Sequence, residues 1–350
     1  MVDSPSRASA EPVAVVQEST RRQMRRAVGL GVGVGILLLV CVLSIMVGAK
    51  PVPVGDVWHG LFQNSGVGND VIVHDVRVPR TLLGLLVGVA LGLSGAVMQG
   101  LTRNPLAEPG LLGVNAGAAA AVVSAIAFLG VSDVGDFVWF AFAGAAVVSV
   151  VVYVLGGSRS ATPVRLALAG TAATAALYGY VNAVQLLNSA ALDQLRFWTV
   201  GSLASADMAT VRRVAPFILL GVVIALLIAR PLNAMEMGDD TARALGANLN
   251  RTRLLAMLAV TLMCGAATAA CGPIVFIGLM VPYLVRAITG PDMRWILPYA
   301  AVLSPVLLLG SDIVGRIVAR PSELQVGIVT ALVGGPVFIH LVRRKRMAKL

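Results

Sequence analysis

The stretch TLLGLLVGVALGLSGAVMQGL, residues 81–101, contains no Asp, Glu, Lys or Arg. A helix that crosses a bilayer needs about 20 mostly apolar residues, because the hydrocarbon core holds no water to satisfy charged or backbone groups. The stretch therefore predicts a transmembrane helix. By the same measure the chain predicts about ten spans, at residues 27–48, 81–101, 111–131, 137–156, 164–188, 211–229, 253–272, 274–288, 296–313 and 325–342. The eighth is short, and we expect it to be broken or partly re-entrant.

Composition agrees with an all-α polytopic membrane protein. Hydrophobic residues make up 57% of the chain and charged residues only 13%, a balance that soluble domains of this length do not show. The formal net charge of +10 could suggest nucleic-acid binding. Its distribution argues otherwise, because Lys and Arg gather in alternate loops, beginning with four arginines in residues 21–26. We therefore expect contact with membrane lipid, no nucleic-acid partner, and both termini in the cytoplasm.

The chain divides into one membrane domain and two tails. Residues 1–26 are polar and lack apolar periodicity, which predicts a disordered cytoplasmic tail. Residues 27–342 form the transmembrane domain, and residues 343–350 form a basic cytoplasmic tail. The first span is longer than the apolar part of a typical secretory signal and no convincing cleavage site follows it, so we expect a mature helix.

Sites for metal, cofactor or catalysis are not indicated. The three cysteines lie within apolar spans and the three histidines lack ligand spacing, so we expect no metal and no cofactor. We also expect all 17 acidic residues to lie outside the span centres, with Asp312 the nearest. This argues against a gradient-driven transporter, which normally keeps a carboxylate at mid-depth, and the lack of a catalytic cluster argues against a membrane enzyme. No G-x-x-x-x-G-K-[ST] loop is present, so ATP hydrolysis would require a separate subunit.

Glycine spacing indicates close helix packing. Gly84, Gly88 and Gly92 recur every four residues in the second predicted span. Small residues on one helix face let backbones approach closely, which is how helices associate where lipid removes the hydrophobic drive.

The fifth predicted span carries a neutral polar stripe. Its polar residues are spaced by three or four positions and so share one helix face. They are Thr171, Thr174, Tyr178, Asn182, Gln185 and Asn188. Such a stripe serves either hydrogen bonding between helices or a hydrated pathway, and six polar groups favour a pathway.

The longest polar connection lies between the sixth and seventh spans. Asp239 or Asp240 can cap a short helix there, and Gly246 can end it in the left-handed conformation. A short capped helix on the cytoplasmic face is a plausible docking element for a soluble partner, and the alternative is a solvated loop.

Several motifs resemble the FecCD type of ABC importer permease. They are RVPRT (77–81), GAVMQ (95–99), NPLAEPGLLG (104–113), residues 238–246, FIGL (276–279), DIVGR (312–316) and VGIVTA (326–331). The resemblance spans the chain from about residue 45 to its end. LRFW (195–198), GSL (201–203) and NAG (115–117) resemble the ferric-enterobactin branch of that family.

The resemblance implies a type II ABC importer permease of the bacterial cytoplasmic membrane. The family has ten helices per subunit, two permease subunits, two cytoplasmic ATPases and an extracytoplasmic binding protein. It implies that this chain is not itself an enzyme and that its cargo is an iron(III)-siderophore, with vitamin B12 or haem as alternatives. The second subunit would be a paralogue or an identical copy.

The resemblance also assigns roles to residues. The ATPase-coupling segment, within residues 236–248, would comprise Gly238, Asp239, Asp240, Thr241, Ala242, Arg243, Ala244, Leu245 and Gly246. The binding protein would dock on an exposed rim at Arg77, Arg80 and Arg316. A cytoplasmic gate would comprise Asn104, Pro105, Leu106 and Thr162. The chain departs from the family pattern at Val275, Tyr283 and Met293, which puts the local geometry of residues 272–295 in question.

Overall fold

The computed structural model describes residues 11–62, 68–131, 134–157 and 163–347, and within them it contains helices and no strands. The first half holds α1 (Glu11–Met46), α2 (Val54–Phe62), α3 (Asn69–Val71), the π-helix η1 (Ile72–Arg77), α4 (Val78–Thr102), the 3-10 helix η2 (Pro109–Leu112), α5 (Val114–Leu129), α6 (Val134–Leu155) and α7 (Pro163–Leu187). The second half holds α8 (Ser189–Trp198), α9 (Met208–Leu227), α10 (Ala229–Glu236), α11 (Asp239–Ala244), α12 (Leu249–Cys271), α13 (Ile277–Thr289), α14 (Met293–Val318) and α15 (Val326–Met347).

Each predicted span coincides with one of these helices, in the order α1, α4, α5, α6, α7, α9, α12, α13, α14 and α15. Six helices in the described residues are long and apolar enough to cross a membrane, judged by length and composition. The apolar parts of α5, α13 and α15 are 10–17 residues long, shorter than those six helices. The short eighth span is therefore confirmed as a short helix, because α13 begins only at Ile277.

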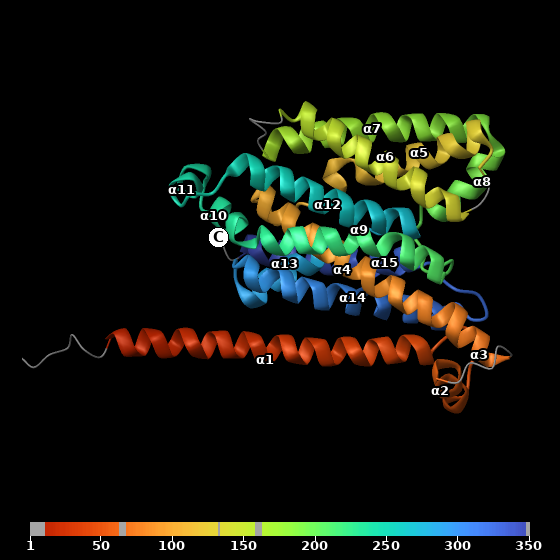
Figure 1. The fold of residues 1–350 in the computed structure, drawn as a ribbon, viewed down its shortest axis with the longest axis horizontal. Helices are drawn as coiled ribbons and strands as arrows, with labels where there is room; N and C mark the ends of the chain where they lie inside the picture. Colours follow the sequence, from red (N-terminus) through yellow and green to blue (C-terminus); the bar gives the residue numbers. More distant parts are fainter. Residues whose placement is uncertain (1–10, 63–67, 132–133, 158–162, 348–350) are drawn as a thin grey trace, which may run out of the picture.

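The long helices lie side by side along one direction (Figure 1). The start of α1, the helices α10 and α11, and the C-terminus lie at one end of the bundle, which we call the α11 end. The helices α2, α3 and α8 lie at the opposite end, which we call the α8 end.

Helix α4 runs through the centre and packs against α14, α12 and α13. Its glycines make the contact with α14 possible, as their spacing predicts. A Cβ atom at Gly88 would lie 2.5 Å from the Cα atom of Pro305, and one at Gly84 or Gly92 would collide with Leu309 or Ser304. Close packing here supplies dispersion contacts that lipid cannot match.

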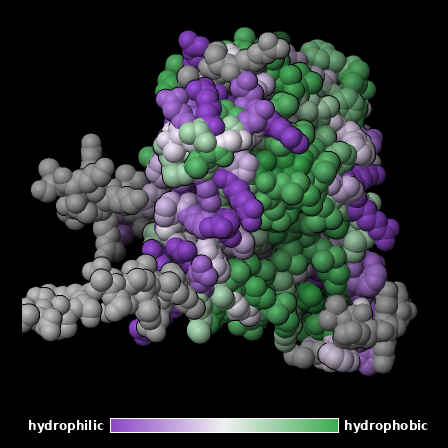
Figure 2. Space-filling model, turned by 60° about the vertical axis from the view of Figure 1, so that its left-hand side comes forward, coloured by the Kyte–Doolittle hydropathy of each residue, from purple (hydrophilic) through white to green (hydrophobic). Residues whose placement is uncertain are grey.

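Helix α1 lies along one side of the bundle and contacts mainly α14 (Figure 1). It begins at Glu11, so residues 11–26 extend this helix in the structure, where the sequence predicted a disordered tail. Residues 1–10 lie outside the described part. Apolar side chains of α1 such as Leu38 and Leu39 are exposed. Figure 2 shows a broad apolar face of the molecule beside hydrophilic residues at the end turned forward. That pattern suits a bundle surrounded by lipid.

Candidate functional site

Helix α11 projects from the end of the bundle named after it (Figure 1). Two glycines frame it: Gly238 has φ 114° and Gly246 has φ 80°, conformations that favour glycine. The positive φ of Gly246 confirms the predicted left-handed end, and the next amide, that of Ala247, donates to the carbonyl of Ala242 at 2.9 Å. Ala242 is buried, whereas Leu245 is 63% exposed. The short helix is thus held on one side and presents the other to its surroundings.

Neither Asp239 nor Asp240 caps α11 as predicted, because Gly238 takes the N-cap position without a side-chain bond. Asp240 instead pairs with Arg243 at 3.0 Å within the same helix. The carboxylate of Asp239 accepts hydrogen bonds from Arg103 and, at 2.7 Å, from Arg253. These two charge-assisted bonds occupy both oxygens of the carboxylate.

The predicted gate residues follow α4 directly. Arg103 ends α4 in the left-handed conformation. The side-chain oxygen of Asn104 then accepts the amide of Leu106 at 2.9 Å, which makes a tight turn around Pro105. Leu106 is 43% exposed. The gating role stays a prediction. Thr162 lies outside the described residues.

After this turn the chain goes back into the bundle. Glu108 lines a cavity of about 10 Å³, room for about one water molecule, together with Leu91, Cys264 and Phe276. Leu91 lies near the middle of α4, so Glu108 lies at mid-bundle depth. The expectation that every acidic residue lies outside the span centres is therefore wrong. A linear count of spans misses it, because Glu108 follows the end of one span and returns with η2.

Two short helices begin beside Glu108. Pro109 starts η2, which leads into α5, and Phe276 is the N-cap residue of α13, with φ 70°. A Cβ atom at Gly278 would lie 2.9 Å from the carbonyl of Leu91 and 3.1 Å from Pro109, so these segments meet closely. Helix N-termini carry partial positive charge, which favours a carboxylate nearby.

The polar stripe of α7 lies on a face that the subunit leaves largely uncovered. Thr171, Tyr178 and Asn182 are exposed, whereas Thr174 and Gln185 are half-buried. Helix α7 packs its other side against α5, η2 and α6. The sixth residue, Asn188, has a structural use, because its amide oxygen accepts the amide of Ala191 at 3.0 Å and caps α8. The role of the stripe as a pathway stays a prediction.

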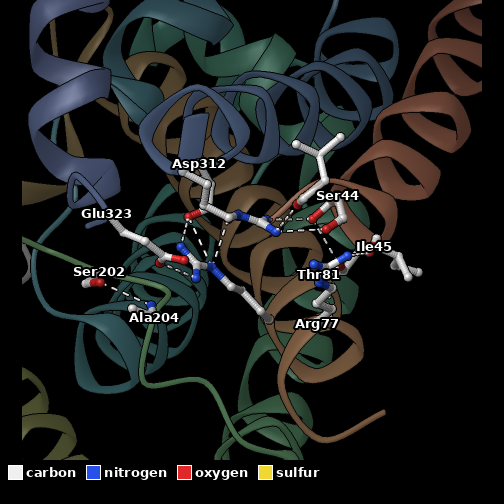
Figure 3. Close-up of polar contacts among 11 residues, drawn as sticks. Ser44, Ile45, Arg77, Thr81, Ser202, Ala204, Asp312 and Glu323 are labelled. Carbon is white, nitrogen blue, oxygen red and sulfur yellow. Dashed lines mark hydrogen bonds and ion pairs between the residues drawn. The ribbon is translucent and has the colours of Figure 1, made fainter. Parts of the chain in front are cut away.

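At the α8 end, charged residues form a buried cluster (Figure 3). The guanidinium of Arg80 contacts Asp312 through two nitrogens, at 3.0 and 2.7 Å, and reaches Glu323 at 2.6 Å. Arg316 donates to the same Asp312 carboxylate at 3.0 Å. Asp312 is fully buried and Arg316 is 1% exposed. The carboxylates pair with the guanidinium groups of Arg80 and Arg316. A buried charge without such a partner would cost free energy.

Arg316 of this cluster and a third arginine, Arg77, hold the end of α1. Arg77 donates to the carbonyls of Ile45 and Met46, each at 2.8 Å, and Arg316 donates to that of Ser44 at 2.8 Å. The last carbonyls of a helix have no partner within the helix, so the guanidinium groups cap α1. The expected exposure of Arg77, Arg80 and Arg316 on a docking rim is therefore wrong, since at most 5% of each is exposed. Docking of a binding protein at this end stays a prediction.

Comparison with known proteins gives the family. The family model described as the FecCD transport family matches residues 36–344. The chain belongs to the FecCD transport family. It is 47% identical to the ferric enterobactin transport system permease protein of Escherichia coli, over 91% of this chain and 96% of that protein. It is 39% identical to an Fe(3+)-citrate import system permease protein of Bacillus subtilis, over 88% and 92%. It is 38% identical to a hemin transport system permease protein of Yersinia pestis, over 79% and 86%.

A solved structure shares the fold of this FecCD protein. It is described as a metal-chelate type ABC transporter in an inward-facing conformation. The TM-score is 0.80 at 27% identity, covering 90% of this chain and 98% of that one. With its apolar helices, the FecCD chain is a multi-pass membrane protein.

The partners of the buried arginines in this FecCD protein differ in how far the sequence indicates them. Asp312 and Arg316 are four residues apart, a spacing at which opposite charges pair on a helix, and this signal was available. The contact between Arg80 and Asp312 joins residues 232 positions apart, and no local pattern indicates it.

A second feature that the sequence does not indicate is a cavity of about 730 Å³ at the α8 end, lined in part by Trp198, Ser202, Asp207 and Arg213. Trp198 and Ser202 belong to the motifs that resemble the ferric-enterobactin branch. In the described part of the chain, no three His, Cys, Asp or Glu side chains lie close enough together to hold a metal ion.

Proposed function

We propose that this chain is the permease subunit of an ATP-driven importer that carries an iron(III)-siderophore across the bacterial cytoplasmic membrane. The observation that carries the proposal is its 47% identity, over nearly its full length, to a ferric enterobactin permease. The Fe(3+)-citrate relative supports the same class of cargo.

The proposed assembly follows from the two ends of the bundle. The α11 end carries the basic termini and faces the cytoplasm, by the positive-inside rule. There a separate ATPase subunit would bind the exposed surface of α11, residues 238–246, and hydrolyse the ATP. The α8 end would face an extracytoplasmic binding protein that delivers the cargo.

A second permease subunit, identical or paralogous, would cover the polar face of α7. In a bilayer an uncovered row of polar groups needs either water or a protein partner. Two α7 faces would enclose a neutral, hydrated route. A route without fixed charge binds its cargo weakly enough to release it, as conduction requires.

Two alternative functions are each supported by one observation. The hemin permease relative keeps haem, and by extension another large metal chelate such as vitamin B12, as an alternative cargo. Glu108, at mid-bundle depth, is a feature that a gradient-driven transporter would use.

Competition uptake tests the cargo. The complete complex in vesicles, energised with ATP, should take up radiolabelled ferric enterobactin, and unlabelled ferric enterobactin should compete, whereas haem and vitamin B12 should not. Competition by haem or vitamin B12 alone would contradict the siderophore proposal and leave an ATP-driven importer of another chelate.

A further inference from the structure

The carboxylate of Asp239 joins three segments at the α11 end. One oxygen pairs with Arg103, the residue that ends α4, and the other accepts from Arg253, near the start of α12, at 2.7 Å. Asp239 is itself the first residue of α11. The proposed ATPase-docking helix is therefore bonded directly to the residue that precedes the gate turn.

Arg103 holds an unusual backbone conformation at this point, with φ 51° and ψ 28°. The left-handed region is sterically unfavourable for a residue with a Cβ atom. Such a residue keeps this conformation only where its surroundings fix it. The ion pair with Asp239 fixes the side chain of Arg103, and the backbone of Arg103 sets the direction in which Asn104, Pro105 and Leu106 leave α4.

Other polar side-chain contacts at the α11 end do not connect α11 to the gate turn. Glu236 of α10 pairs with Arg286 of α13 at 2.8 Å. The side chain of Asn233 donates to Asp292, at the start of α14, at 2.8 Å. The Asp240 pair stays within α11. Helix α10 also packs against α4, so among the ion pairs of the described residues the Arg103–Asp239 pair is the one that joins α11 to the gate turn.

We propose that the Arg103–Asp239 ion pair transmits the movement of α11 to the turn at residues 104–106, so that both are positioning residues of the transport cycle. This rests on the proposed function, since an ATPase must move α11. The pair is partly exposed, with 36% of the Arg103 side chain and 32% of the Asp239 side chain accessible. Exposed pairs add little to stability. Loss of the pair should therefore change coupling without unfolding the protein.

The variants are chosen to change the charge of the pair while keeping the backbone conformation of Arg103. Arg103→Asn removes the cation but keeps a residue that tolerates the left-handed conformation. Asp239→Asn removes the anion with little change in shape. Arg103→Lys keeps the cation and should rescue. Arg294→Asn is the matched control, because Arg294 is also an arginine of this end paired with an aspartate, at 3.1 Å, but that partner is only two residues away.

The first measurement is the amount of ferric enterobactin imported per ATP hydrolysed, using the complete complex in vesicles. Arg103→Asn and Asp239→Asn should each lower this ratio at least about fivefold, the lower range of coupling between sites, while ATP hydrolysis continues. The double variant should be no worse than Asp239→Asn alone, because Asp239→Asn already removes the pair with Arg103 together with the pair with Arg253. Arg103→Lys and Arg294→Asn should keep a ratio near that of the unmodified chain. An unchanged ratio in Arg103→Asn, or additive losses, would overturn the inference.

The second measurement does not depend on cargo. A cysteine placed at the exposed Leu106 should react with a water-soluble thiol reagent at a rate that changes when the ATPase binds ATP. This change should disappear when Arg103→Asn is added. If it persists, or never occurs in the chain with Arg103 intact, the inference is wrong. Failure of ferric enterobactin uptake with an intact ATP-dependent change at residue 106 would instead count against the proposed cargo.

Discussion

Arg80 and Asp312 form a buried ion pair in which two guanidinium nitrogens face one carboxylate, at 3.0 and 2.7 Å. Two-point contacts of this kind fix geometry as well as charge. The pair links α4 to α14, and Arg316, on the same carboxylate, continues the link to the end of α1. The central helices and the peripheral α1 are therefore joined through Asp312 at the α8 end (Figure 3).

Asp312→Ala should lower the free energy of unfolding by about 3–5 kcal/mol, because it leaves two buried guanidinium groups without their carboxylate. Thermal unfolding in detergent would measure the loss. Asp193→Ala is the control, since the Asp193 side chain is 65% exposed and pairs only loosely with Arg196, at 3.5 Å. Equal stability of the two variants would show that the buried cluster does not hold the α8 end together.

The burial also affects how docking is tested. Reversing Arg80 or Arg316 to glutamate would place a second carboxylate beside Asp312, so loss of binding-protein stimulation in such variants would not by itself show docking. Direct binding of the binding protein must be measured on variants that unfold at the temperature of the unmodified chain.

Gly95→Ala should destabilise the bundle, because a Cβ atom there would collide with the carbonyl of Gly278 in α13. Overpacking of a tight contact typically costs about 1–3 kcal/mol. Gly31→Ala in α1 is the control, since nothing lies within 4 Å of its Cβ position. The unfolding temperatures of the two variants in one detergent give the comparison. No difference between them would mean that α4 and α13 pack less closely than described.

Replacing Asn182 and Gln185 together with leucine should reduce uptake by about tenfold, equivalent to about 1.4 kcal/mol on the barrier to passage. The reason is that both lie on the polar stripe of α7, where water and cargo would pass. Ala183→Leu adds a leucine to the same helix off the stripe and should have little effect. Assembly with the ATPase should survive in both variants, as copurification would show. Normal uptake by the double leucine variant would remove the pathway hypothesis.

Glu108→Gln distinguishes transport driven by ATP from transport driven by an ion gradient. Under the importer account, uptake should stay ATP-driven when ion gradients are collapsed, and this variant should lose only the modest attraction of nearby helix N-termini, about 0.3–1 kcal/mol. Uptake assays with ionophores measure the first effect, and thermal unfolding in detergent measures the second. Abolition of uptake by Glu108→Gln together with abolition by ionophores in the unmodified chain would favour a gradient-driven transporter.

Most of the bundle could be predicted because its signals are local. An apolar run fixes the place of a helix such as α4, and glycine spacing fixes which face of α4 meets α14. The left-handed turn at Gly246 likewise follows from one residue and its neighbours. The helical start of α1 was missed, because residues 11–26 lack the apolar pattern on which the prediction depended.

The site was predicted less completely because its geometry depends on distant contacts. Nothing in the sequence near Glu108 shows that the chain turns back into the bundle, and nothing near Arg80 names Asp312 as its partner. The three arginines were expected on an exposed rim because the family resemblance implied docking there. In the structure the end of α1 covers Arg77 and Arg316 and uses them as its cap.

The central claim is that this membrane bundle is moved through α11 by an ATPase that it does not contain. Uptake of ferric enterobactin into vesicles, measured with the ATPase present, with the ATPase omitted, and with residues 239–244 scrambled, tests it most directly. We predict ATP-dependent accumulation only when the ATPase and the native order of residues 239–244 are both present. Accumulation without the ATPase, or undiminished accumulation with the scrambled segment, would contradict the account.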